Sequence, residues 1–187
     1  MALLEIKKHG CPVLRRKATP VTAFDGDIKA LVEDMFETMY EAEGVGLAAP
    51  QIGVLQRVIV LDVSAHNPSF QPVALINPEV VEVEGEIESD EGCLSFPGLT
   101  GDVKRPLKTR VRGLDVEGKP VELQASELGA RAVLHEIDHL DGILFIDHIS
   151  ALKRHLLRGA LRKLQKEGEK QSQAKRIVEL KAISSRP

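Results

Sequence analysis

The segment from residue 126 to 142 constrains the fold more than any other part of the sequence. It reads SELGARAVLHEIDHLDG, in which Ser126 can cap a helix and Gly142 can end one, so we predict a helix over residues 127–140. Its main apolar residues are Leu128, Leu134 and Ile137. Because these side chains need a core to bury them, the polar face of the same helix must point inward or into a cleft. The fold therefore has to be built around a helix that carries polar groups.

Short segments with the patterns of helices and strands surround this central helix. An earlier amphipathic helix is predicted to begin at Asp25 or Asp27 and to end at Gly44. Its buried stripe consists of Ile28, Leu31, Val32, Met35, Phe36 and Met39. Strands are predicted over residues 57–63, 73–76, 80–87, 109–116 and 121–123. We therefore predict an α+β fold, in which short antiparallel strands surround the central helix and a C-terminal helix follows.

Turn residues and charge alternation add three details to this prediction. Asn77 and Pro78 are expected to stop the strand over residues 73–76. Apolar and acidic residues alternate over residues 80–87, which indicates a half-exposed strand. Residues 117–120 are expected to form a hairpin turn between the last two strands.

The chain is long enough, at 187 residues, to bury a core of its own. We expect one domain over residues 1–150 and a basic helical extension and tail over residues 151–187, with the helix spanning residues 151–167. Residues 150–187 contain 11 Lys and Arg against 3 Asp and Glu, whereas the rest of the chain contains 14 against 25. An acidic body with a basic tail points to a binding partner.

The sequence favours a cytoplasmic protein. No apolar run approaches the roughly 20 residues that a membrane span needs, and the first residues resemble neither a signal peptide nor a transit peptide. The two cysteines, Cys11 and Cys93, lie far apart in different contexts. We therefore expect no disulfide and a reducing compartment.

Two histidines four residues apart mark a candidate metal site on the central helix. His135 and His139 lie on one face, where they can bind one ion, and Glu136 can reach a water on that ion. The ion lowers the pKa of its water, and the carboxylate takes the proton. The alternative is an exposed polar helix face, which the apolar residues of the same helix disfavour.

The third ligand of such a site has several candidates. Zinc peptidases with this motif use a third histidine where this chain has Phe145, or a later glutamate, which here would fall in the basic tail. His148 and Asp141 remain as candidates, although both follow the helix too soon for easy closure. Cys93 is the better candidate, because a thiolate beside two imidazoles gives a catalytic site with one open position.

Three motifs together resemble those of the peptide deformylase family. They are Gly44-Val-Gly-Leu-Ala-Ala-Pro-Gln51, Glu91-Gly-Cys-Leu-Ser95 and His135-Glu-Ile-Asp-His139, in the family's order. The resemblance implies a deformylase-like catalytic domain over residues 1–150. It also implies a metal-dependent hydrolase that removes the N-formyl group from the N-terminal formylmethionine of nascent polypeptides and releases formate. A metal-bound water would attack the formyl carbon, with Glu136 as general base and then as general acid.

The resemblance assigns roles to individual residues. Cys93, His135 and His139 would be the metal ligands, with Fe2+ as the metal and Zn2+ or another divalent ion as the alternative. The Gln51 side chain and the Leu94 backbone N–H would stabilise the oxyanion.

Further residues would bind the N-formylmethionyl peptide in an extended form. They are Gly44, Val45, Gly46, Gly92, Leu128 and Ala132. The glycines over residues 44–46 are expected to leave room for the peptide backbone. The apolar residues would form the pocket for the methionine side chain.

Some residues near the motifs are expected to support the site, and others depart from the family. Ion pairs are expected among Glu91, Asp138 and Arg105. Cys11 stands at a position that is acidic in the family, and we interpret it as structural. Arg131 replaces an apolar residue of some relatives, and Thr100 replaces an arginine that contacts substrate in some. These departures affect the pocket more than the chemistry.

The basic tail suggests the ribosome as a partner. The helix over residues 151–167 carries an apolar stripe of Leu152, Leu156, Leu157, Ala160, Leu161 and Leu164. Basic residues surround this stripe, and nascent chains emerge from an RNA-rich surface. The alternative is a solvated helix that docks only in part.

Three other functions fit the sequence less well. Residues 44–49 match the G-x-G-x-x-A pattern of dinucleotide-binding loops, but a helix precedes them and a strand follows, which reverses the required context. A zinc endopeptidase would lack its standard third ligand. An RNA-binding module with a structural metal would need four protein ligands, and three are found.

Overall fold

The computed structural model describes residues 3–184, with side chains to residue 173. The α-helices in this range are α1 (Gly26–Glu41), α2 (Glu127–Leu140) and α3 (Ala151–Ser184). The strands are β1 (Gly46–Ala48), β2 (Val58–Leu61), β3 (Val73–Glu84), β4 (Ile87–Gly92), β5 (Thr100–Arg105), β6 (Lys108–Leu114) and β7 (Pro120–Ser126). Short 3-10 helices are η1 (Pro12–Arg15), η2 (Ala49–Ile52) and η3 (Phe145–Asp147).

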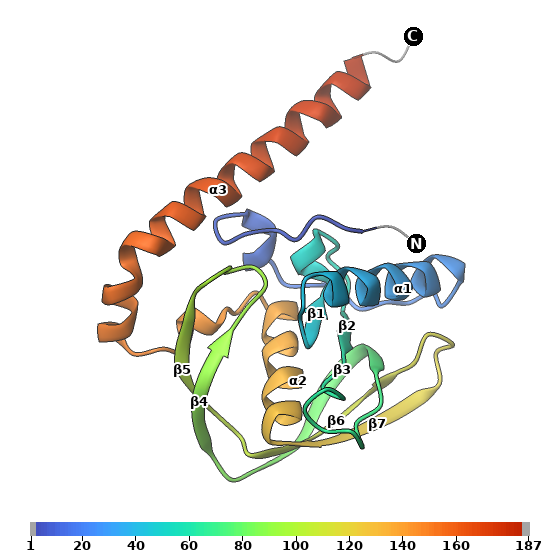
Figure 1. The fold of residues 1–187 in the computed structure, drawn as a ribbon. Helices are drawn as coiled ribbons and strands as arrows, with labels where there is room; N and C mark the ends of the chain where they lie inside the picture. Colours follow the sequence, from blue (N-terminus) through green and yellow to red (C-terminus); the bar gives the residue numbers. More distant parts are fainter. Residues whose placement is uncertain (1–2, 185–187) are drawn as a thin grey trace.

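The strands form two antiparallel sheets, and α2 lies between them (Figure 1). The larger sheet has the strand order β1-β2-β3-β6-β7, whereas β4 and β5 pair as a separate hairpin. Val133 and Leu140 of α2 are buried in one cluster with Ile59, Leu61 and Val111 of the larger sheet. The prediction of an α+β fold with antiparallel strands around a central helix is therefore confirmed.

Helix α1 begins and packs as its sequence predicts. The Asp25 side chain accepts hydrogen bonds from the backbone N–H groups of Asp27 and Ile28, so Asp25 is the cap. The predicted stripe faces a second core cluster, in which Leu47, Val58 and Val60 are also buried.

Helix α2 spans the predicted residues, but its start differs from the prediction. Glu127 has a left-handed backbone (φ 50°), and its N–H donates to the Leu107 carbonyl at 2.8 Å. The Ser126 side chain makes no capping hydrogen bond. The turn at Glu127 carries the chain from β7 into α2, and the tertiary bond to Leu107 stands in for the expected cap.

Strand β3 does not stop at Asn77 and Pro78, as the sequence predicts. It continues to Glu84 through a shift of register between Ile76 and Glu79. Asn77 adopts a left-handed backbone (φ 52°) in this bulge, and its amide exchanges two hydrogen bonds with the Val21 backbone, at 2.8 and 2.9 Å. Because the register shifts at Asn77 and Pro78, the lack of an N–H group on the proline does not end the strand.

The segment predicted as a half-exposed strand over residues 80–87 is divided between two strands. β3 ends at Glu84, Gly85 turns the chain with φ 68°, and β4 begins at Ile87. Residues 79–84 are exposed throughout, and Val83 retains 53% of its surface, so the expected half-burial is wrong. Strands β1, β4 and β5 were not predicted.

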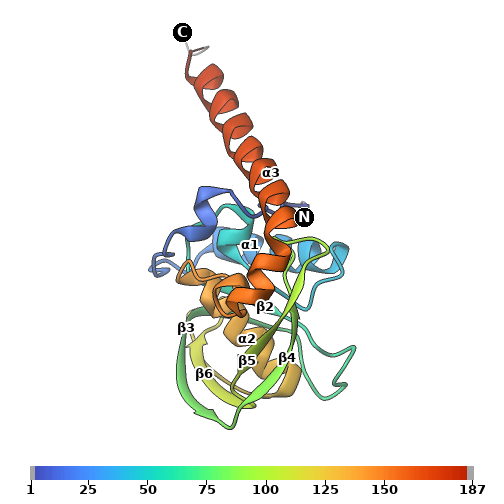
Figure 2. The ribbon, with the colours of Figure 1, turned by 90° about the vertical axis from the view of Figure 1, so that its left-hand side faces the viewer.

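Helix α3 runs well beyond residue 167 and leaves the body of the protein along its outer half (Figures 1 and 2). Leu161 and Leu164 are buried in a cluster with Leu14 and other residues. In contrast, Leu152 and Leu156 are 71% and 72% exposed, so only part of the predicted apolar stripe docks. No helix in the described range is long and apolar enough to cross a membrane.

The N-terminal segment, residues 5–11, is held against α3. The Lys8 N–H donates to the Gln171 side chain at 2.9 Å, and the Lys8 ammonium pairs with Glu167 at 2.8 Å. A Cβ atom at Gly168 would lie 2.5 Å from the Lys8 carbonyl oxygen, closer than any real contact. Glycine at this position therefore allows the two backbones to touch.

This close crossing predicts opposite effects for two glycines of α3. Replacing a helical glycine by alanine normally stabilises a helix by about 1 kcal/mol. Gly159 has no atom within 4 Å of an added Cβ, so we expect Gly159→Ala to be stabilising. Gly168→Ala forces α3 away from Lys8 and is expected to lower the free energy of unfolding by about 1–3 kcal/mol. Urea denaturation measures both changes, and an equal gain in both variants would contradict the close crossing.

Candidate metal centre

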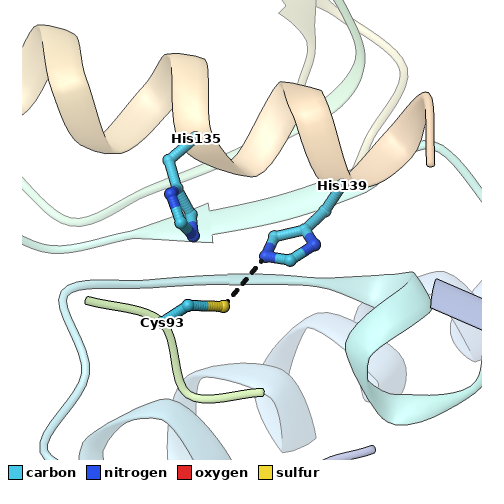
Figure 3. Close-up of side chains that lie close together, drawn as sticks. All are labelled: Cys93, His135 and His139. Carbon is cyan, nitrogen blue, oxygen red and sulfur yellow. Dashed lines mark hydrogen bonds between the residues drawn. The ribbon is translucent and has the colours of Figure 1, made fainter. Parts of the chain in front are cut away.

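Three side chains with metal-binding atoms converge where β4 ends beside α2 (Figure 3). Cys93 directly follows β4, and His135 and His139 project from successive turns of α2. Their ligand atoms lie within 4.8 Å of one another, and Cys93 Sγ is 3.2 Å from His139 Nε2. Since zinc lies about 2.0–2.3 Å from nitrogen and sulfur ligands, this spacing suits three ligands of one ion.

The other candidates for the third ligand lie elsewhere. The Asp141 carboxylate pairs with Arg57 at 2.9 Å, and His148 Nε2 lies 2.8 Å from an oxygen of Asp138. Phe145 is buried in the core. Within the described part of the chain, Cys93 is the residue that joins the two histidines in such a cluster.

The Glu91 carboxylate orients one of the two histidines. Its Oε2 lies 3.0 Å from His135 Nδ1, so Nε2 of that ring is left for an ion. Arg105 donates from Nε and Nη2 to the same carboxylate, at 2.8 and 3.1 Å. Burial alone would raise the pKa of Glu91, but the hydrogen bonds from His135 and Arg105 lower it to about 2. Glu91 therefore stays ionised at neutral pH and can hold the Nδ1–H tautomer of His135.

Arg105 also reaches the helix that carries the histidines. Its Nη1 donates to Asp138 at 2.7 Å, which confirms the ion pairs predicted among Glu91, Asp138 and Arg105. His139 differs from His135, because its Nδ1 is buried with no hydrogen-bond partner among the described residues. Burial holds the pKa of His139 well below its usual range, so the ring is neutral and free to bind an ion.

Glu136 is buried beside the histidines in surroundings that favour its protonated form. Its Oε2 has no hydrogen-bond partner among the described residues. Burial raises the pKa of Glu136 to about 7. A Cβ atom at Gly46 would lie 2.6 Å from Glu136 Oε1. The glycine that was expected to leave room for a peptide thus leaves room for this carboxylate.

The Gln51 amide points at the same cluster. Its Oε1 accepts the Ala48 N–H at 2.8 Å, and its Nε2 donates to the Ser95 hydroxyl at 3.2 Å and lies 3.6 Å from Cys93 Sγ. Ser95 had no role predicted from the sequence, although it is fully buried. The sequence feature that could have indicated a role for Ser95 is its position two residues after Cys93.

A cleft of about 330 Å³ opens beside Glu136. Its lining includes every residue that the sequence predicts for substrate binding, namely Gly44, Val45, Gly46, Gly92, Leu128 and Ala132. Leu94 also lines it, and a Cβ atom at Gly44 would lie 2.7 Å from the Leu94 side chain. The glycine at 44 is therefore packed against the protein itself.

Charged residues for which the sequence predicts no catalytic or binding role also line the cleft. Glu43 and Asp90 do so from the loop before β1 and from β4. Arg131 lines it from α2 and donates to the Ser89 hydroxyl on β4. Thr100 pairs with Gly92 across the β4–β5 hairpin, and a Cβ atom added at Gly92 would lie 3.5 Å from the Thr100 methyl group.

The arrangement has the parts needed for hydrolysis of an amide bond. If Cys93, His135 and His139 bind one ion, three protein ligands would leave it with an open position, as in catalytic sites. A buried carboxyl group with a pKa of about 7 can both accept and release a proton near neutral pH. A side-chain amide beside them can donate to a developing negative charge.

Comparisons with known proteins agree with this chemistry. Residues 3–155 match the family model described as polypeptide deformylase. The peptide deformylase of Thermodesulfovibrio yellowstonii is 54% identical over 158 residues, which cover 84% of this chain and 96% of the relative. The crystal structure of a peptide deformylase from Legionella pneumophila has a TM-score of 0.82 at 44% identity and covers 88% of this chain and 96% of that one. The enzyme from Thermus thermophilus has a TM-score of 0.81 at 46% identity, covering 87% and 98%.

Proposed function

The chain belongs to the polypeptide deformylase family, whose members are metal-dependent hydrolases that remove the N-formyl group from nascent peptides, and we propose that the cluster around Cys93 is the centre at which it does so. The observation that carries this proposal is the convergence of Cys93, His135 and His139 beside a cleft. We assign these three residues as the metal ligands.

The donor set fits either Fe2+ or Zn2+, because one thiolate and two imidazoles suit both ions. We propose Fe2+ in the cell, which the family resemblance favours, with Zn2+ as an alternative occupant. The bound ion would supply Lewis-acid chemistry, which activates a water and polarises the formyl oxygen.

The residues of the chain divide the remaining work. Glu136 accepts the proton of the attacking water and then delivers it to the departing amine, which its pKa of about 7 allows. The Gln51 amide and the Leu94 N–H donate to the oxyanion. Of the two bonds that Gln51 Nε2 donates, the 3.6 Å contact with Cys93 Sγ is the longer and the easier one to redirect. One such donor is worth about 3 kcal/mol of transition-state stabilisation.

The substrate is bound in the cleft. Val45, Leu128 and Ala132 offer an apolar wall for the methionine side chain, and Gly92 leaves the backbone at the end of β4 open to an extended peptide. Since formylated chains are made by ribosomes, we place the protein in the cytoplasm.

Formate release from a formyl-methionyl peptide tests this function. We expect turnover by protein loaded anaerobically with Fe2+, and loss of turnover after the metal is removed with a chelator, because the open position is lost with the ion. The same peptide with an acetyl group is the control. Absence of formate release would overturn the proposal, and cleavage of internal peptide bonds instead would favour the zinc endopeptidase alternative.

We further propose that α3 binds the ribosome. Three arginines recur at one-turn spacing on α3 and line a groove together with His155, namely Arg154, Arg158 and Arg162. The positive charge of this face contrasts with the net negative charge of the rest of the chain and suits binding to RNA phosphates.

Charge reversal tests the ribosome proposal better than removal of α3. Leu161 and Leu164 are buried, so a chain that ends at Ser150 would lose part of its core. We expect the double variant Arg158→Glu and Arg162→Glu to co-sediment with ribosomes about tenfold more weakly at low salt. The control is Lys29→Glu with Lys104→Glu, which changes the net charge equally on α1 and β5. Equal co-sedimentation of the two double variants would remove the proposal.

A further inference from the structure

A chain of hydrogen bonds connects His135 with a histidine at the protein surface. His135 Nδ1 lies 3.0 Å from Glu91, which accepts from Nε and Nη2 of Arg105. Arg105 Nη1 donates to Asp138 at 2.7 Å, and Asp138 lies 2.8 Å from His148 Nε2. His148 follows η3 and is the outermost member, with 34% of its side chain exposed.

Asp138 is the member of the chain whose side-chain position depends most on His148. Its side chain is 19% exposed, whereas those of Arg105 and Glu91 are 6% and 3% exposed. Both donors, Arg105 Nη1 and His148 Nε2, contact the same oxygen, Oδ2. Two donors from different elements on one oxygen hold the carboxylate in a rotamer that it would otherwise exchange with others facing solvent. His148 thereby fixes the acceptor for Arg105.

The Arg105 guanidinium couples the position of the Asp138 carboxylate to that of the buried Glu91 carboxylate. Its nitrogens form a rigid planar fork, so a displacement of Nη1 also moves Nε and Nη2. Those two atoms hold both oxygens of Glu91, at 2.8 and 3.1 Å. Glu91 in turn sets the ring orientation and tautomer of His135.

We propose that His148 is a positioning residue for the metal centre, which acts through Asp138, Arg105 and Glu91 on His135. It does not touch the metal ligands itself, since its Nε2 is directed at Asp138. This inference rests on the proposed metal centre and adds a residue to it that lies outside the three family motifs.

Metal affinity is the direct measure of this role. The full-length metal-free protein is titrated with Co2+ in competition with a chromogenic chelator, and the visible absorption of the Co2+ form is recorded. Losing a partner in contact with a metal-bound histidine costs about 10–100-fold in affinity. His148 acts through three intervening residues, so we expect His148→Ala to weaken Co2+ binding about three- to fivefold and to shift the absorption bands.

Two further variants separate the hydrogen bond from packing. His148→Gln keeps a donor that can reach Asp138 and is expected to restore affinity and spectrum. His148→Leu has a similar size without a donor and should behave as His148→Ala does. In the Asp138→Asn background, His148→Ala is expected to have no further effect, because the link through which it acts is already changed.

The control is His66→Ala, a replacement of an exposed histidine in the loop between β2 and β3 that should leave Co2+ binding unchanged. If the unaltered protein binds Co2+ and His148→Ala and His148→Leu match it in affinity and spectrum, the role of His148 is overturned while the metal centre stands. If the unaltered protein binds no Co2+, the metal centre fails and this inference fails with it. Additive effects of His148→Ala and Asp138→Asn would also overturn the pathway through Asp138.

Discussion

We expect Glu136→Gln to lower kcat/KM for a formyl-methionyl peptide by about 10²–10⁴-fold while the protein keeps its metal, because general acid–base catalysis contributes that range. The replaced group is a buried carboxyl with one oxygen unpartnered among the described residues, beside His135 and the cleft. Glutamine has the same shape but cannot accept the proton. Formate release and metal content measured on the same preparations separate loss of chemistry from loss of the ion.

The same replacement should stabilise the metal-free protein at high pH. Burial raises the pKa of Glu136 from 4.5 to about 7, so between these values the folded state holds a proton that the unfolded chain has released. Stability is therefore lost as the pH rises through this window, and glutamine avoids the loss. We expect the gain in unfolding free energy from Glu136→Gln to be about 2 kcal/mol larger at pH 8 than at pH 5.

The matched control is Glu88→Gln, which replaces an exposed carboxylate on β4. It should change neither turnover nor the pH dependence of stability. Turnover by Glu136→Gln that equals that of the control would sink the assignment of Glu136. A gain in stability without a loss of turnover would show that Glu136 is buried but takes no part in catalysis.

Removal of the thiolate should abolish the metal centre. We expect Cys93→Ala to weaken metal binding by more than about 100-fold. Loss of a residue that only contacts a metal ligand costs up to about 100-fold in affinity, and Cys93 is itself one of the three ligands we assign. Formate release is expected to fall with it. In the Co2+ form, the sulfur-to-metal absorption of the unaltered protein should be absent from the variant.

Cys11→Ala is the matched control, because it removes the other thiol of the chain. Cys11 is buried at the N-terminal end of η1, away from the cluster of Cys93. We expect it to lower stability slightly and to leave the absorption of the Co2+ form unchanged. Retention of the sulfur-to-metal absorption in Cys93→Ala, or its loss in Cys11→Ala, would contradict the ligand assignment.

The helices and the cluster of metal-binding side chains were the parts most open to prediction from sequence. In α1 and α2 the apolar spacing and the nearby glycines determine the element and its buried face, since these signals lie within one turn of each other. His135, Glu136 and His139 share α2, so their proximity follows from helix geometry. The exception is Ser126, whose expected cap is replaced by a bond from Glu127 to a residue distant in sequence.

Strands β4 and β5 could not be found in the same way. The inward-facing residues of β5 are Gly101, Val103 and Arg105, which do not form an apolar alternation. Arg105 can be buried because Glu91 and Asp138 neutralise it, and both are supplied by other elements. A buried charge with remote partners leaves no local pattern.

The choice of third ligand depended on the same hairpin. From the residues alone, Cys93 was the better candidate, whereas Asp141 and His148 were disfavoured but not excluded. The pairing of β4 with β5 brings Glu91 to His135 and Cys93 to His139, whereas Asp141 and His148 are engaged by Arg57 and Asp138. Ser95 was overlooked because its contact with Gln51 joins residues 44 positions apart.

The contact between residues 5–11 and α3 has a consequence for synthesis. Lys8 lies 159 residues before Glu167 and 163 residues before Gln171, so it is translated well before either partner. Contacts of such sequence separation form late in folding, after the chain between them has closed. Residues 5–11 of a newly made copy therefore stay undocked until Glu167 and Gln171 have left the ribosome.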